Sequence, residues 1–90
     1  MNNRKVYVRV SVSFTPEGDM IPQSITWTDG RVYRIDSLLD VKVACSMKNP
    51  ACGDRYTVAV HGKISYLYFE RSAELTGNNV GRWYTQRQTA

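Results

Sequence analysis

The sequence predicts an all-β domain, a small antiparallel meander of five to six strands that forms a barrel or a strongly curved sheet. One long segment alternates apolar and polar residues without interruption, which is typical of a half-buried strand. Two further segments each place a glycine-containing turn between apolar runs, which is the pattern of a β-hairpin. No segment predicts a helix longer than about one turn, so the sheet must supply most of its own core.

The alternating segment runs from Lys5 to Phe14 and predicts the first strand. Its inner face comprises Val6, Val8, Val10, Val12 and Phe14, and its outer face comprises Tyr7, Arg9, Ser11 and Ser13. The residues Thr15 to Asp19 then predict a turn, because Pro16 presets φ and Gly18 accepts a positive φ.

The first hairpin joins Ile21–Thr28 to Arg31–Asp36, and its loop length sets the register. A two-residue loop of Asp29 and Gly30 would place Arg34 on the same face as Trp27. A three-residue loop, Thr28 to Gly30, pairs Trp27 with Arg31 and gathers the apolar residues Ile25, Trp27, Tyr33 and Ile35 on one face. We therefore predict the longer loop, as a type I turn with Gly30 left-handed.

Leu38 to Cys45 is consistent with either a short helix or a strand, and its valines and alternation favour the strand. In that strand Leu39, Val41, Val43 and Cys45 share the core-facing phase. Ser46 to Asp54 predicts a loop.

The second hairpin joins Arg55–His61 to Ile64–Glu70, and Gly62 and Lys63 are expected to form a type II′ turn. This register pairs His61 with Ile64, Val58 with Leu67, and Tyr56 with Phe69. Its inner face comprises Tyr56, Val58, Val60, Leu67 and Phe69, and its outer face comprises Thr57, Ala59, His61, Ile64, Tyr66 and Tyr68.

The remaining residues predict little regular structure. Arg71 to Gly77 is expected to form a short helical turn near 71–77, capped by Ser72, and the residues from Gly77 to Gly81 a loop. Arg82 to Thr85 predicts a last strand with Trp83 inward, followed by a frayed tail from about residue 86. With 90 residues, the chain is expected to form a single β domain over 1–90.

The composition narrows the functional classes. The formal net charge of +4 is compatible with an acidic partner such as nucleic acid, and equally with an ordinary soluble surface. No signal peptide and no membrane-spanning segment are predicted, so we expect a cytoplasmic protein with reduced cysteines and no membrane partner.

The chemistry-bearing residues do not predict an enzyme, a cofactor or a metal site. His61 falls at a hairpin tip, and Cys45 and Cys52 lack the spacing of zinc or redox pairs. Asp36 with Asp40 offers two carboxylates around a bend, which is weak support for a divalent cation site. Glu17 and Asp19 lie in a turn and are interpreted as solvated. Nucleotide-binding glycine motifs are absent from the sequence.

The remaining candidate is an outer sheet face that mixes aromatic and basic residues. It comprises Tyr7, Arg9, Arg34, Tyr66, Tyr68, Arg82 and Tyr84. Such faces bind single-stranded nucleic acid by base stacking and phosphate contacts, which suggests a non-enzymatic binding module. The expected stacking residues are Tyr66, Tyr68 and Tyr84, and the expected phosphate ligands are Arg9, Arg34 and Arg82. Two alternatives remain: the tyrosines simply stabilise the sheet, or they anchor a protein partner or a small homo-oligomer.

The segment from Ile25 to Asp36 resembles a W-x-D-G-x-x-Y-x-I-D pattern in a group of small uncharacterised bacterial proteins. The segment Arg55-Tyr56-Thr57-Val58 is similar to the R-Y-x-V of that group, and Gly81-Arg82-Trp83-Tyr84 to its closing G-R-W-aromatic motif. The residues from Arg71 to Val80 depart from the pattern as a longer insertion. The resemblance implies a shared fold and no assigned activity.

Overall fold

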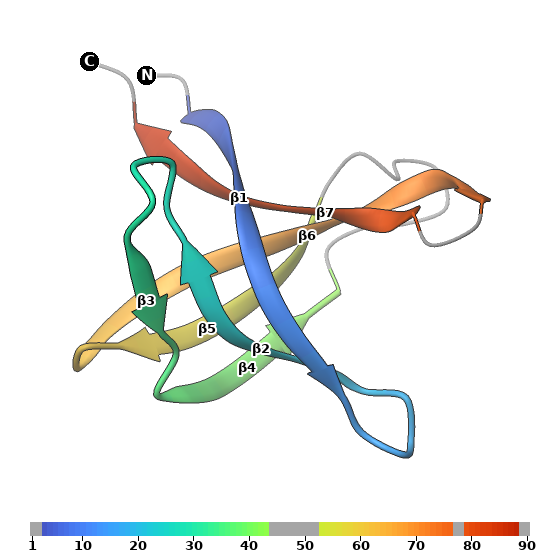
Figure 1. Cartoon of the computed structure of the whole chain (residues 1–90), viewed down its shortest axis with the longest axis horizontal. Helices are drawn as coiled ribbons and strands as arrows, with labels where there is room; N and C mark the ends of the chain where they lie inside the picture. Colours follow the sequence, from blue (N-terminus) through green and yellow to red (C-terminus); the bar gives the residue numbers. More distant parts are fainter. Residues whose placement is uncertain (1–2, 44–52, 77–78, 89–90) are drawn as a thin grey trace.

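A computed structural model describes residues 3–43, 53–76 and 79–88 of the chain. These residues form seven antiparallel strands in a single strongly curled sheet (Figure 1). The strands are β1 (Asn3–Phe14), β2 (Met20–Thr26), β3 (Val32–Arg34), β4 (Ser37–Lys42), β5 (Asp54–Val60), β6 (Lys63–Thr76) and β7 (Asn79–Gln88). The all-β prediction is confirmed, with slightly more strands than expected.

The sheet has the order β3-β2-β1-β7-β6-β5-β4, which is a meander closed between its first and last strands. Within the described residues, every pair of consecutive strands forms a ladder except β3 and β4, which occupy the two edges. Only Ile35 and Asp36 separate these edges along the chain. The Ile35 amide donates to the Gln23 carbonyl in β2, and the Asp36 amide donates to the Ala59 carbonyl in β5. This corner holds the two edges together at one end, so the sheet forms a half-barrel.

The interior of the half-barrel holds the apolar core. The core consists of Ile25, Ile35, Tyr56, Val58, Leu67, Phe69 and Trp83. Val8, Val10 and Val12 of β1 pack against it, which confirms the predicted inner face of the first strand. Phe14 is an exception and is 64% exposed, because it lies at the end of the strand beside the 15–19 turn.

The first hairpin has the predicted register and turn. Ile25 pairs with Tyr33, and the Trp27 amide donates to the Arg31 carbonyl at 2.7 Å. The Gly30 amide donates to the Trp27 carbonyl, and Gly30 has a φ of 91°. Arg34 is exposed, whereas Ile25 and Ile35 are buried.

The predicted register of the second hairpin is wrong by two residues. The loop consists of His61 and Gly62, with φ values of 52° and 75°, so that Val60 pairs with Lys63 and Tyr56 with Leu67. Two left-handed residues define a type I′ turn, and histidine is among the residues that tolerate a positive φ. The predicted inner and outer faces survive, because a shift of two residues preserves the side of every side chain.

The strand predicted over Leu38–Cys45 is confirmed from Leu38 to Lys42, where β4 ends, but its apolar residues after Leu38 are not buried in the core. Leu38 pairs with Val58 and packs against the core, and a bulge follows between Leu38 and Asp40. Leu39, Val41 and Val43 are 53%, 42% and 66% exposed. They remain exposed because β4 is an edge strand. It has a neighbouring strand, β5, on one side only, so side chains along its free edge are not packed against a second strand. Cys45, Cys52 and residues 46–52 of the predicted loop lie outside the described residues. Asp54, the last residue of that predicted loop, is instead the first residue of β5.

The C-terminal third contains more strand than expected. The predicted helical turn near 71–77 is wrong: β6 continues to Thr76, and Ser72 lies within that strand. Asn79 to Gly81 belong to β7 rather than to a loop. The tail does not fray at residue 86, since Gln86, Arg87 and Gln88 pair with Lys5, Arg4 and Asn3. These strands depend on partners distant in the sequence, which local pattern does not reveal.

Candidate ligand-binding site

Three of the predicted face residues, Tyr7, Tyr68 and Tyr84, meet on the outer side of β1, β6 and β7. Tyr68 and Tyr84 stack with ring centroids 5.1 Å apart, and Tyr7 meets Tyr84 edge-on at 5.8 Å. Tyr84 is only 2% exposed, and its hydroxyl accepts a hydrogen bond from the Gly53 amide at 3.2 Å. Burial raises the pKa of the Tyr84 phenol. The Tyr84 ring, which was expected to stack on a ligand, is therefore covered by the protein itself.

Glu70 lies on the same outer surface and forms ion pairs with two basic side chains of that surface, Lys5 and Arg82. Lys5 Nζ and Arg82 Nη2 each lie 2.8 Å from a Glu70 carboxylate oxygen, and the Tyr7 hydroxyl donates to both oxygens. The Arg82 guanidinium also lies 4.1 Å from the centroid of the Tyr7 ring. The hydrogen bond from Lys5 is the main cause of the lowered pKa of Glu70, opposed by partial desolvation. The predicted phosphate ligand Arg82 is thus already engaged within the protein.

The other predicted face residues lie apart from this cluster. The ring of Tyr66, 49% exposed, lies under the Arg55 guanidinium at 4.9 Å. Arg9 and Arg34 are exposed on β1 and β3, where they pair with Thr26 and Ser24 of β2. The structure therefore divides the predicted face into separate patches.

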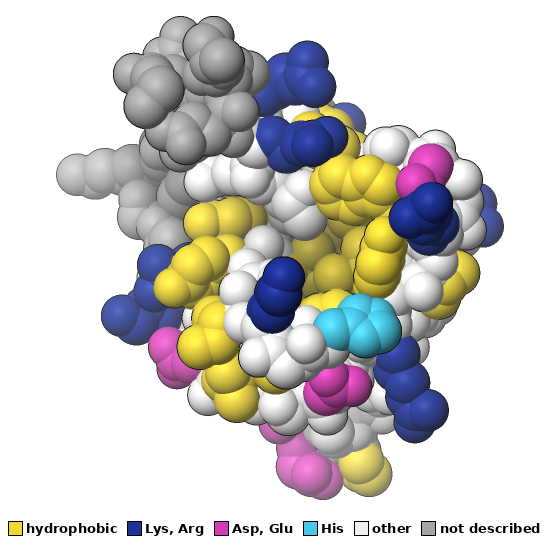
Figure 2. All heavy atoms as spheres, turned by 90° about the vertical axis from the view of Figure 1, so that its left-hand side faces the viewer, with side chains coloured by type: hydrophobic (Ala, Val, Ile, Leu, Met, Phe, Trp, Pro, Cys, Tyr) yellow, Lys and Arg dark blue, Asp and Glu magenta, His cyan; other side chains and the backbone are white. Residues whose placement is uncertain are grey.

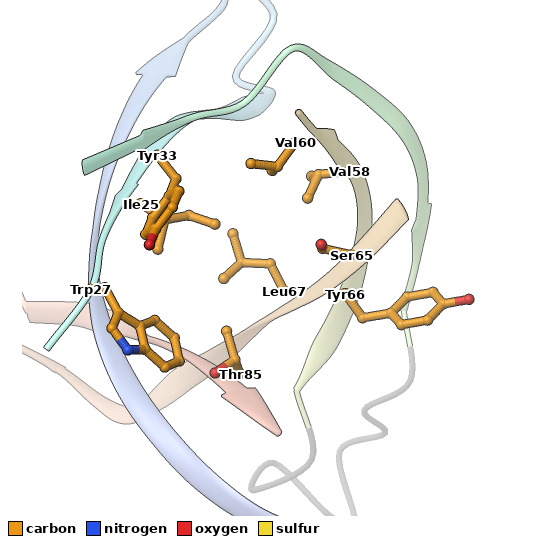
Figure 3. Close-up of a pocket in the computed structure, with 9 residues that line it drawn as sticks. All are labelled: Ile25, Trp27, Tyr33, Val58, Val60, Ser65, Tyr66, Leu67 and Thr85. Atoms are coloured by element: carbon orange, nitrogen blue, oxygen red, sulfur yellow. The ribbon is translucent and has the colours of Figure 1, made fainter. Parts of the chain in front are cut away.

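The interior of the half-barrel contains an apolar cavity of about 210 Å³ (Figure 3). Its lining includes Trp27, which follows β2, and Val60, the last residue of β5. One wall is formed by Ile25, Trp27 and Tyr33, and the facing wall by Val58, Val60 and Leu67 (Figure 3). The Tyr66 ring points away from the cavity. Carbon atoms dominate the lining, so the cavity suits an apolar group.

Two aliphatic hydroxyl groups interrupt this apolar lining. Ser65 of β6 pairs with Val58, and Thr85 of β7 pairs with Val6, so both side chains share the inner face. Among the described residues, the buried Thr85 Oγ1 has no hydrogen-bond partner. A buried hydroxyl without a partner is costly and would gain from a bound polar group.

The mouth of the cavity is bordered by aromatic and basic side chains. Figure 2 shows hydrophobic side chains lining a hollow, with Lys and Arg side chains, the histidine and acidic side chains around it. The Arg87 guanidinium lies 5.7 Å from the centroid of the Trp27 ring, and the His61 ring meets Tyr33 edge-on at 6.1 Å. The Asp36 carboxylate accepts a hydrogen bond from the His61 amide, which holds this turn beside the cavity. The Asp36 carboxylate, considered above with Asp40 for a divalent cation site, therefore has a structural contact with the second hairpin turn.

The cavity was not predicted from the sequence, although its wall residues were assigned correctly to the inner face. The alternation of residues indicates which side chains point inward, but not whether they fill the interior. The one sequence signal was the presence of Ser65 and Thr85 in phase with buried apolar residues, where larger apolar residues would pack better.

A second buried polar contact lies away from the cavity. Arg71 donates from Nε and Nη2 to Asp54 Oδ2, at 3.1 and 2.9 Å, and Asp54 is 4% exposed. The pKa of Tyr56 is raised, chiefly by burial and then by the Asp54 charge.

Over residues 3–43, 53–76 and 79–88, no cluster of three or more His, Cys, Asp or Glu side chains is arranged to hold a metal ion. The same ranges include no helix of the length and apolarity required to cross a bilayer. Comparisons with protein-family models, curated proteins and solved structures find no match for this chain.

Proposed function

We propose that this protein is a non-enzymatic binding module whose ligand is a small molecule with an apolar body, held in the interior cavity. The observation that carries the proposal is the cavity of about 210 Å³ between the walls of the half-barrel. Protein interiors are normally close-packed, and unfilled apolar space lowers stability. A cavity of about 150 Å³ is enough to hold benzene, so this one has room for a substituted ring.

The lining supports binding rather than catalysis. The nine lining residues supply hydroxyl groups and apolar surface, and none carries a carboxylate, imidazole, thiol or amine. A few polar groups in an apolar pocket orient a ligand, whereas general acid–base work needs a group that titrates near the working pH.

Single-stranded nucleic acid on the outer face is supported less well. Tyr84 is buried, and Glu70 already binds Arg82 and Lys5. Stacking on exposed rings and contacts to free cations supply most of the affinity for single strands. The remaining exposed rings, Tyr7 and Tyr66, stand on separate patches.

Blocking the cavity tests the proposal. Ser65→Phe places a ring inside the space, whereas Ser65→Ala removes only the hydroxyl and serves as the matched control. The probe is naphthamide, a neutral aromatic compound of suitable size, with binding measured by calorimetry. We expect the wild type and Ser65→Ala to bind it and Ser65→Phe to lose at least about tenfold in affinity. Val60→Phe provides a second block from the facing wall, and circular dichroism checks that both variants fold.

Equal naphthamide binding by the wild type and both blocked variants would contradict the proposal, as would no binding to any of them. Salt-sensitive binding of an oligothymidylate that Arg9→Gln and Arg34→Gln weaken, without naphthamide binding, would favour the outer face instead. A mass that rises with concentration, again without naphthamide binding, would favour the homo-oligomer.

A further inference from the structure

Two arginines form a cross-strand pair, and one of them lies over a wall residue of the cavity. Arg4 of β1 lies directly opposite Arg87 of β7, and both are exposed. Like charges placed directly opposite each other destabilise an antiparallel pair. An anion that contacted both guanidinium groups would relieve this repulsion, and here the pair also borders an apolar cavity.

Both side chains belong to the inner face. Along β7, Arg87 follows Trp83 and Thr85 at period two, and Trp83 is in the core while Thr85 lines the cavity. The Arg87 guanidinium lies over Trp27, a wall residue of the cavity. Arg4 occupies the same face by the register of the ladder, because its partner is Arg87.

Over residues 3–43, 53–76 and 79–88, the pair has no carboxylate partner. In the described part of the chain, Arg71, Arg82 and Lys5 each form an ion pair, whereas neither Arg4 nor Arg87 does. Lys63 adds a further positive charge on this side, because it pairs with the lining residue Val60 and is exposed. Positively charged side chains therefore lie beside a cavity whose lining is mostly apolar.

We infer that Arg4 and Arg87 form the anion-binding end of the cavity, and that the ligand is a small aromatic or aliphatic carboxylate. Its apolar body would lie between the walls, and its carboxylate would reach the two guanidinium groups. Guanidinium forks match the two oxygens of a carboxylate, and such charge-assisted contacts are stronger than neutral ones. This inference rests on the proposed function and specifies further that the ligand carries a negative charge.

Naphthoate and naphthamide form a matched pair of probes, because they share one ring system and differ in the charge of the substituent. At low salt we expect calorimetry to show naphthoate binding about tenfold more tightly than naphthamide. Raising the salt concentration should shrink this difference, because the guanidinium groups are exposed.

Single-charge variants identify the groups responsible. Arg4→Gln and Arg87→Gln should each weaken naphthoate binding about threefold or more and leave naphthamide binding nearly unchanged. Lys42→Gln removes the same charge from an exposed position on β4, where Lys42 pairs with Arg55, and should affect neither probe. Equal losses in all three variants would indicate a general charge effect and overturn the inference.

The two proposals fail in different ways. Equal affinity for both probes, with binding still lost in Ser65→Phe, would overturn the anion site and leave the cavity as a neutral binding site. Naphthoate binding that depends on Arg4 and Arg87 but not on Ser65→Phe would instead show a surface anion site and contradict the interior ligand.

Discussion

Tyr68 and Tyr84 stack on the outer side of the half-barrel, with ring centroids 5.1 Å apart and ring planes inclined by 10°. The Tyr84 hydroxyl accepts the Gly53 amide hydrogen, so the ring is held at both its face and its tip. A Cβ atom at Gly53 would lie 2.8 Å from that hydroxyl and 2.9 Å from the Tyr68 Cβ. The contact joins the start of β5 to β6 and β7 and makes Tyr84 a structural residue.

Removing the Tyr84 hydroxyl should therefore reduce stability. Tyr84→Phe leaves the Gly53 amide without its acceptor, and we expect a loss of about 1–2 kcal/mol in the free energy of unfolding, measured with urea. Tyr66→Phe is the matched control, because Tyr66 is 49% exposed, and it should change stability by less than about 0.5 kcal/mol. Equal stability of the two variants would contradict the structural role.

The Asp54–Arg71 contact gives a second prediction. Arg71→Met leaves a nearly buried carboxylate without its cation and should cost about 1–3 kcal/mol in urea unfolding. Arg31→Met breaks the exposed pair with Asp29 and should cost at most about 1 kcal/mol. Adding Asp54→Asn to Arg71→Met should recover part of the loss, because the uncompensated charge is removed. An unaltered or larger loss in the double variant would argue against a charge effect.

The lowered pKa of Glu70 predicts a stability change at acidic pH. A carboxyl group whose pKa is lower in the folded than in the unfolded protein adds stability above its unfolded pKa. That stability disappears as the pH falls through the folded value. The pKa of Glu70 lies below its ordinary value of 4.5, mainly through the hydrogen bond from Lys5.

The comparison that tests this effect is Glu70→Gln against the wild type in thermal unfolding between neutral pH and about pH 2. The wild type should be more stable near neutral pH, and the difference should narrow as the pH falls below about 4.5. A difference that stays constant over this range would show that Glu70 contributes through packing rather than charge. Glu17→Gln, in the exposed 15–19 turn, is the control.

The second hairpin turn predicts opposite effects at two neighbouring positions. His61→Asn should stabilise the protein by a few tenths of a kcal/mol to about 1 kcal/mol, because Asn-Gly is the preferred type I′ pair. Gly62→Ala should destabilise it by about 1 kcal/mol, because φ is 75° at that residue. Urea unfolding measures both changes. Destabilisation by His61→Asn together with tolerance of Gly62→Ala would contradict the type I′ turn, because that turn needs a positive φ at both residues.

The errors at β4 and in the second hairpin have separate physical causes. The apolar alternation of Leu39, Val41 and Val43 is the same in a central strand and in an edge strand, and only the order of strands decides its exposure. Turn chemistry at His61, Gly62 and Lys63 allowed two loops displaced by one residue, whose strand registers differ by two residues. Both loops bury the same side chains, so the apolar pattern could not distinguish them.

The sequence by itself determined the all-β class, the first strand, the first hairpin with its turn, and the side of the sheet to which Val8, Ile25 and Leu67 belong. These features depend on local backbone geometry and on the period of two in a strand. Only the tertiary structure decided that Tyr84 is covered, that Arg4 faces Arg87, and that five strands leave a cavity between Trp27 and Leu67. These features arise from contacts between residues distant in the chain, and their burial depends on which strands become neighbours.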